Sequence, residues 1–276
     1  MRVGFIGLGS QGGPMARAIV DGGYDMTLWA RRAESLEPFA DTTAKVAGSP
    51  AELGAASDLV CLCVVGDADV EEVLGGDTGV LAGMAEGGIM RGIIAIHSTV
   101  HPDTCQRLAE SAAAKGVSLI DAPVSGGAPA VNENRLLVMV GGDPEIVERC
   151  RPVFETYANP VIHLGGLGSG QVAKLLNNLM FTANLANAKT TLELGEALGV
   201  NTSSLSDVLT RGSASSSALN SIAAMGGSLD VLSQIAGTLL QKDVRLVVDI
   251  AGKAGASPGA VLDAADAALK LLGHPR

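Results

Sequence analysis

Short apolar runs alternate with helical patterns throughout the first 165 residues of this chain. This order is typical of a parallel β-sheet covered by helices on both faces, because parallel strands need a crossover connection that is usually a helix. The runs expected to form strands are Val3–Ile6, Met26–Trp29, Leu59–Val65, Ile93–Ile96, Val117–Ile120, Leu136–Val140 and Val161–His163. The sequence therefore predicts an α/β Rossmann-type N-terminal domain over residues 1–165.

The pattern becomes entirely helical after Gly165-Gly166. From Ser169 to about Leu198 there is no proline, and apolar side chains recur at helical spacing, which predicts one long helix. Gly199 stands where a left-handed C-terminal cap is expected. Further helices are expected at Ser203–Thr210, Val231–Ala236, Leu239–Ala254 and Pro258–Leu272. We predict that residues 166–276 form an all-α C-terminal domain.

The composition excludes several classes of protein. The 276-residue chain is 47% apolar, enough to bury a core, and its net charge of −10 argues against nucleic acid and anionic membranes as partners. No apolar run approaches the roughly 18 residues of a membrane span, and the N-terminal apolar stretch is too short for a secretory signal. The four cysteines lack the spacing of a disulfide framework or a metal site. We therefore expect a cytoplasmic protein without a metal.

The first chemical motif is a glycine-rich hexapeptide. It lies between the strand expected at Val3–Ile6 and the helix expected at Pro14–Val20, where backbone N–H groups and the helix N-terminus bind a pyrophosphate. The alternative is a tight turn without a ligand, because a chain with 36 glycines produces such a motif by chance. The residues predicted to bind the cofactor here are Gly7, Leu8, Gly9, Ser10, Gln11 and Gly12.

Two arginines follow the next strand. An NAD enzyme usually has Asp or Glu there to bond the ribose 2′-hydroxyl, whereas this chain has Arg31 and Arg32. A guanidinium can bind a 2′-phosphate that a carboxylate would repel, so we predict NADP as the cofactor. The alternative is that both arginines are solvated surface residues.

Three more loops follow the carboxyl ends of predicted strands, where open α/β sheets bind ligands. Val64 and Val65 end the third strand, Thr99 follows the fourth, and a loop beginning at Asp121 follows the fifth. The last loop contains Ser125, Gly126 and Gly127, whose hydroxyl and backbone N–H groups could bind a carboxylate. The alternative is a turn in which the glycines only supply positive φ angles. We also expect Gly66, Gly168 and Gly170 to line this crevice.

The long helix carries Lys174 and Asn178 four residues apart, hence on one face. Lys174 lies in an apolar segment, where desolvation would lower its pKa toward a value suited to acid/base chemistry. A lysine near a helix start is otherwise usually a surface side chain. Lys242 and Asp243 are equally ambiguous, since each could face solvent.

Together these motifs resemble those of the β-hydroxyacid dehydrogenases, the family of 3-hydroxyisobutyrate dehydrogenase and tartronate semialdehyde reductase. The resemblance covers nearly the whole chain and rests on FIGLGSQGGPMA at 5–16, STVHP at 98–102, DAPVSGG at 121–127, LLVMVGGD at 136–143, GSGQVAKLLNN at 168–178 and QKDVRL at 241–246.

The resemblance implies hydride transfer between NADP and a small 3-hydroxy acid or its semialdehyde. It implies that Lys174 is the general acid/base, that Ser125, Gly126, Gly127 and Asn178 bind the substrate, and that Thr99 and Lys242 lie near the nicotinamide. It also implies a helical domain that forms a homodimer or homotetramer.

The chain departs from the family pattern at three positions that bear on substrate choice. Ala130 and Asn134 stand where the family usually has glycines, and Ser215 occupies a segment that often carries an arginine. Two other functions stay open. Imine reductases share the architecture but generally lack the lysine, and a non-catalytic NADP-binding module would need neither Lys174 nor Asn178.

Overall fold

The computed structural model describes residues 1–88 and 92–276. The chain divides into two compact units, Met1–Lys174 and Leu175–Arg276. The long helix α8, Ser169–Ala197, carries residues of both units. Each unit is described by itself below.

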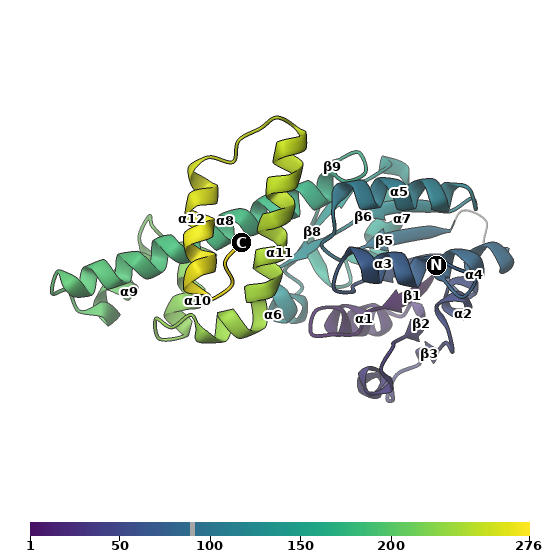
Figure 1. Ribbon diagram of the computed structural model, residues 1–276. Helices are drawn as coiled ribbons and strands as arrows, with labels where there is room; N and C mark the ends of the chain where they lie inside the picture. Colours follow the sequence, from purple (N-terminus) through teal and green to yellow (C-terminus); the bar gives the residue numbers. More distant parts are fainter. Residues whose placement is uncertain (89–91) are drawn as a thin grey trace. The chain divides into compact units, whose positions relative to one another are not determined.

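The described part of the first unit forms a nine-stranded sheet in the order β3-β2-β1-β4-β5-β6-β8-β7, with β9 paired to β8 (Figure 1). The strands are β1 Arg2–Ile6, β2 Asp25–Trp29, β3 Lys45–Val46, β4 Leu59–Leu62, β5 Ile93–Ile96, β6 Ser118–Asp121, β7 Val124–Ser125, β8 Leu136–Gly141 and β9 Ala158–Gly165. All seven predicted strands are present, and the fold class is confirmed. The strand predicted over Leu59–Val65 ends at Leu62, so Val64 and Val65 lie in the loop after it. The sheet is not wholly parallel, because β8 runs antiparallel to β6 and β7.

Helices cover both faces of this sheet, as the continuous apolar runs predicted. Successive residues of β4 point to opposite sides, so that Cys61 packs in one buried cluster and Leu62 in the other. The first cluster includes side chains of α1 Gly12–Asp21, α6 Gly127–Asn132 and α7 Pro144–Phe154. The second includes side chains of α2 Pro50–Ala55, α3 Asp67–Leu74, α4 Val80–Glu86 and α5 Pro102–Ala113.

The second unit contains the rest of α8 together with α9 Thr202–Arg211, α10 Ser217–Ala224, α11 Asp230–Lys253 and α12 Ala260–Leu271. Gly199 has the positive φ of +78° expected of a left-handed cap. The two helices predicted on either side of Gly237 are one continuous helix, α11. A side chain at Gly237 would meet the ring of His274, so this glycine permits packing instead of ending the helix. Within the described ranges, no helix is both long and apolar enough to cross a membrane.

A buried histidine lies at the end of β5 within the first unit. His97 packs among Phe5, Phe154 and Tyr157. Its Nδ1 donates to the Ala122 carbonyl oxygen at 2.6 Å, and its Nε2 accepts from the Tyr157 hydroxyl at 3.2 Å. Both ring nitrogens are therefore satisfied in the neutral form, and burial lowers the pKa of His97 from 6.5 to about 4.

This pKa predicts that the protein loses stability in mild acid. Between pH 6.5 and pH 4 the unfolded state binds a proton at His97 that the folded state does not, so the free energy of unfolding falls as the pH falls through this window. The loss assigned to His97 is about 3 kcal/mol. Urea unfolding at several pH values should show this slope in the parent and a flatter one in His97→Gln. Equal slopes in the two proteins would show that His97 does not cause it.

Candidate functional site

The glycine loop between β1 and α1 has two glycines packed against other backbone atoms and one glycine with free space beside it. Gly7 has a φ of +99° and lies against the backbone of Cys63, while Gly12 lies against the Gly7 carbonyl. A Cβ at Gly9, in contrast, would meet no heavy atom within 4 Å in the described part of the chain. These are the roles that a dinucleotide-binding loop gives its glycines, namely a tight turn, close approach of a pyrophosphate, and packing of the helix on the strand. The loop therefore fits the pyrophosphate of a dinucleotide cofactor.

The remaining residues of the loop differ in their surroundings. Leu8 is buried in the core cluster that includes side chains of α1, whereas Ser10 is exposed. The Gln11 amide donates to the Met15 sulfur at 3.5 Å. The Gln11 side chain thus reaches along α1, the helix that begins directly after it.

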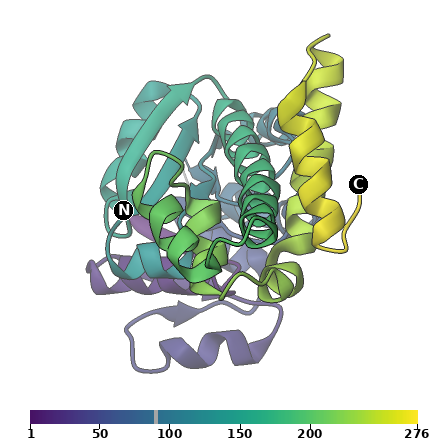
Figure 2. The same ribbon diagram turned by 90° about the vertical axis from the view of Figure 1, so that its left-hand side faces the viewer.

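The segment after β2 carries Arg31 and Arg32, both exposed. The Arg31 guanidinium pairs with two carboxylates of α3, Glu72 at 2.9 Å and Asp69 at 3.5 Å. Arg32 precedes the 3-10 helix η1, Ala33–Phe39. This segment lies at one margin of the first unit, where Figure 2 shows it as the purple arm at the bottom of the view.

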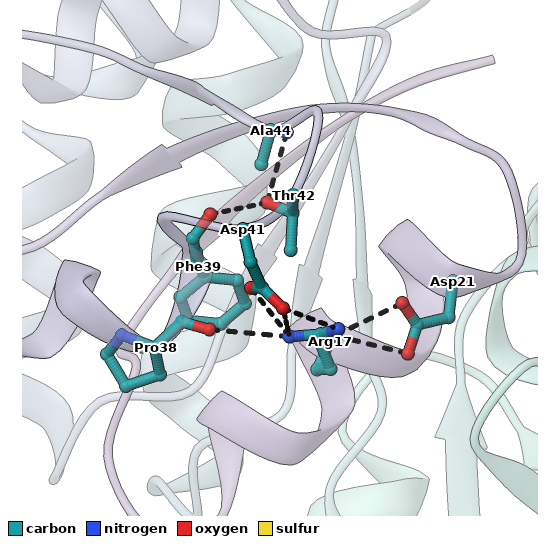
Figure 3. A network of polar contacts seen from close by, with 7 residues as sticks. All are labelled: Arg17, Asp21, Pro38, Phe39, Asp41, Thr42 and Ala44. Carbon is teal, nitrogen blue, oxygen red and sulfur yellow. Dashed lines mark hydrogen bonds and ion pairs between the residues drawn. The ribbon is translucent and has the colours of Figure 1, made fainter.

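Arg17 of α1 binds to residues at the end of this segment, Pro38 and Asp41 (Figure 3). Its guanidinium donates to Asp41 at 3.0 Å and to the Pro38 carbonyl oxygen at 3.4 Å, while its Nε donates to Asp21 at 3.1 Å. The Thr42 hydroxyl closes the turn by donating to the Phe39 carbonyl oxygen at 2.7 Å. These bonds attach the segment after β2, which contains Arg31 and Arg32, to α1, the helix that follows the glycine loop.

Buried polar groups join the loops at the carboxyl ends of β4 and β5. The Val64 N–H donates to the Ser98 hydroxyl at 2.8 Å. Ser98 is buried, Thr99 is half-buried, and Val65 is exposed. A Cβ at Gly66 would meet no atom within 4 Å of it among the described residues, so space beside this loop is open.

Asp121 and Gln171 fix the first turn of α8 to the same edge of the sheet. The buried Asp121 carboxylate at the end of β6 accepts the N–H groups of Gly168 at 2.6 Å and Gln171 at 2.7 Å. The buried Gln171 side chain accepts the Val100 N–H at 3.1 Å and donates to the Ser98 carbonyl oxygen at 2.8 Å. Burial raises the pKa of Asp121, and the backbone N–H groups oppose that rise.

The glycines of this turn serve packing. A side chain at Gly170 would collide with the Met139 carbonyl of β8, and Gly168 has a φ of +92° beside Pro102. Gly170 is thus buried against β8, and no side chain fits at this position. The close contact brings α8 onto the sheet, with Lys174 half-buried in its second turn.

Ser125, Gly126 and Gly127 lie together where β7 meets α6. Gly126 and Gly127 have φ angles of +131° and +71°, so both need glycine. Asn134, in the connection between α6 and β8, has a φ of +50°. Asn is the side chain that most readily replaces glycine in this conformation, so the backbone keeps the shape that a glycine would allow. Ala130 is buried beside Gly126.

Asn178 and Lys242 lie in the helical unit around one buried carboxylate. The Asn178 amide nitrogen donates to Asp243 at 2.6 Å, and the Lys242 ammonium lies 3.1 Å from the other oxygen of Asp243. Asp243 is buried on α11 and does not face solvent. Its carboxylate therefore holds the side chains of Asn178 and Lys242 in place. The amide of Asn177 donates to the Asn178 oxygen at 3.1 Å.

Ser215 lies in the loop before α10. It borders a cavity between α8 and α10 that is also lined by Met180, Asn184, Asn187 and Ser216. The described lining contains no cationic side chain where the family often has an arginine.

Two family models cover almost the whole chain. The NAD binding domain of 6-phosphogluconate dehydrogenase matches residues 2–165, and the model described as NAD-binding of NADP-dependent 3-hydroxyisobutyrate dehydrogenase matches residues 168–271. The chain belongs to the β-hydroxyacid dehydrogenase family. It is an oxidoreductase of that family with an NAD(P)-binding domain.

Individual relatives of this β-hydroxyacid dehydrogenase carry different names. The 3-hydroxyisobutyrate dehydrogenase of Pseudomonas aeruginosa is 34% identical over 218 residues, 79% of this chain and 72% of the relative. The NAD-dependent L-serine dehydrogenase of the same organism is 31% identical over 218 residues, again 79% and 72%. A Mycobacterium tuberculosis 3-hydroxyisobutyrate dehydrogenase solved with L-serine is 26% identical with a TM-score of 0.84, covering 99% of this chain and 95% of that one.

Three buried polar residues, to which the sequence assigns no role, contact predicted site residues or their neighbours in the chain. Asp121, Gln171 and Asp243 lie inside motifs that the sequence made visible, but none was assigned a role there. The signal available in advance was a charged or amide side chain inside an otherwise apolar motif, which must find partners when buried. In the described ranges, no cluster of three or more metal-ligating side chains is found.

Proposed function

We propose that this chain transfers a hydride between NADP and a small 3-hydroxy acid or its semialdehyde, with Lys174 as the general acid/base. The observation that carries the proposal is the attachment of α8 by Asp121 and Gln171. It holds the turn before Lys174 at the carboxyl ends of β5 and β6, the same edge of the sheet as the glycine loop after β1. A cofactor on that loop and a proton donor on α8 would then serve one reaction.

The cofactor residues follow from the loop geometry. The N–H groups around Gly9 and the start of α1 would hold the pyrophosphate, and Arg31 with Arg32 would bind the 2′-phosphate. Val64, Val65 and Thr99 would border the nicotinamide half, and the family resemblance adds Lys242. The bound nicotinamide supplies the hydride acceptor or donor.

The protein's own residues then bind the substrate and move a proton. The Ser125 hydroxyl and the N–H groups of Gly126 and Gly127 would hold the substrate carboxylate, and the resemblance gives Asn178 a contact with the same molecule. In the oxidative direction the Lys174 amine takes the proton of the substrate hydroxyl. In the reductive direction the ammonium returns that proton to the carbonyl oxygen.

The names of the relatives support the substrate class. Two relatives are named after 3-hydroxyisobutyrate and L-serine. Both molecules carry a hydroxyl group on the third carbon, counted from the carboxyl carbon. A panel of small 3-hydroxy acids and their semialdehydes, followed by the absorbance of the reduced cofactor, tests the proposal. Turnover of a cyclic imine in place of the acids would identify an imine reductase. Cofactor binding without any turnover would identify a non-catalytic module.

The cofactor preference rests on Arg31. We predict that the parent protein uses NADP better than NAD, and that Arg31→Asp reverses this order because a carboxylate repels the 2′-phosphate. The ratio of kcat/KM for the two cofactors should shift by at least about tenfold toward NAD, since a charge-assisted contact worth roughly 1.5–3 kcal/mol is lost. Equal use of both cofactors by the parent would remove the basis of this assignment.

The helical unit supports the proposed homo-oligomer. Exposed apolar side chains on its helices include Leu194, Leu198, Val208, Ile235 and Leu239. Single exposed apolar side chains are ordinary in soluble proteins. Five of them on one helical unit favour a surface that another subunit covers. We propose a homodimer or homotetramer formed through this unit, which light scattering on the purified protein would test.

A further inference from the structure

We propose that Glu72 sets how strongly Arg31 responds to the 2′-phosphate of the cofactor, and is thus a specificity-determining residue that contacts no reacting atom. This inference rests on the proposed use of NADP. It concerns a carboxylate of α3 that lies outside the glycine loop and outside the segment carrying the two arginines.

The geometry places two acids on the arginine that the phosphate needs. Arg31 Nη2 lies 2.9 Å from Glu72 Oε2 and 3.5 Å from Asp69 Oδ1. Asp69 and Glu72 are three residues apart on α3 and hence on one face of that helix. The side chains of Arg31 and Glu72 are 59% and 66% exposed, so a ligand in solution can reach the pair.

A bound 2′-phosphate changes the state of this pair. It must either take the guanidinium from Glu72 or share it, and in both cases a dianionic group comes close to a carboxylate. NAD has only a hydroxyl at this position, so its binding neither breaks the Arg31–Glu72 ion pair nor brings a second negative charge close to Glu72. Glu72 therefore weakens the binding of the phosphorylated cofactor selectively.

The size of the effect follows from the exposure of the pair. Exposed ion pairs contribute little because water and salt screen them, so removing the Glu72 charge should change affinity by about twofold to fivefold. The change should be larger at low ionic strength than at high ionic strength, since screening acts on both the pair and the repulsion.

The chain offers a matched control beside Glu72. Glu71 is the preceding residue of α3, but it pairs with Arg107 of α5 instead of Arg31. Glu71→Gln therefore removes the same charge from the same helix without touching the proposed phosphate site.

The experiment measures binding by calorimetry with adenosine 2′,5′-bisphosphate and with 5′-AMP. We expect Glu72→Gln to bind the bisphosphate about twofold to fivefold more tightly than the parent, with 5′-AMP unchanged, and Glu71→Gln to change neither. In an Arg31→Ala background the gain from Glu72→Gln should shrink, because the group it acts through is gone. An unchanged bisphosphate affinity, or equal gains for both nucleotides, would overturn the proposal.

The two proposals fail in different measurements. The use of NADP is judged by the parent protein alone, from its preference for the bisphosphate over 5′-AMP. The role of Glu72 is judged by the ratio between variant and parent. A parent that prefers the bisphosphate, combined with a silent Glu72→Gln, would leave the cofactor assignment standing and reject the role of Glu72.

Discussion

Replacement of Lys174 by alanine should lower kcat by about 10²–10⁴-fold while leaving the affinity for NADPH nearly unchanged. The reason is that, in the proposed reaction, the amine would carry the proton of the reacting oxygen, whereas the glycine loop and the two arginines would hold the cofactor. Steady-state rates with the best substrate of the panel, together with NADPH binding followed by fluorescence, measure both quantities.

Lys253→Ala is the control for the loss of one lysine. Lys253 is an exposed residue near the end of α11 that pairs with Asp249 at 3.0 Å, so its loss should change neither kcat nor binding. A Lys174→Ala protein with near-normal kcat would reject the acid/base assignment. A parallel loss of NADPH binding would show that Lys174 acts on the cofactor instead.

Asp121→Asn should both destabilise the protein and slow catalysis. The substitution replaces one of the two buried acceptor oxygens by an NH₂ group that faces a backbone N–H of α8. Hydrogen bonds to buried charged groups contribute roughly 1.5–3 kcal/mol each, so the free energy of unfolding should fall by about 2–4 kcal/mol. Because the first turn of α8 then shifts, kcat should fall by at least about tenfold. Urea unfolding and steady-state kinetics measure the two effects.

Asp143→Ala separates this effect from the ordinary loss of a helix cap. Asp143 caps α7, where its carboxylate accepts the Glu145 N–H at 2.8 Å, but it is exposed. Its replacement should cost about 1 kcal/mol and leave kcat unchanged. If Asp121→Asn loses stability but keeps its kcat under conditions where the protein is folded, Asp121 supports the fold without positioning Lys174.

The main strands and helices could be predicted because their signals are local. Runs such as Leu59–Leu62 are buried on both faces and stay apolar throughout, and the helical spacing after Ser169 extends over many turns. The two-residue strands β3 and β7 carry no such signal, since a period cannot be read from two residues. Two helices, Val231–Ala236 and Leu239–Ala254, are predicted where the structure has the single helix α11, because only the folded structure shows His274 packed against Gly237.

The candidate site divides in the same way. The turn at Gly7 and the left-handed pair Gly126-Gly127 could be predicted, because glycine spacing constrains the local backbone directly. The contacts of Arg31 with Glu72 and of Asp121 with Gln171 join residues 41 and 50 positions apart. Such contacts depend on strand order and on which helix covers which edge, and a single sequence does not encode them locally.

The most direct test of the proposed reaction follows the hydride itself. The protein would be incubated with NADPH deuterated at C4 of the nicotinamide, in each of its two stereochemical forms, and with the semialdehyde that the panel shows to be the best substrate. Mass spectrometry of the hydroxy acid should find deuterium on the hydroxyl-bearing carbon from one of the two forms. A hydroxy acid without deuterium from either form, or no NADPH-dependent product with any member of the panel, would contradict direct hydride transfer.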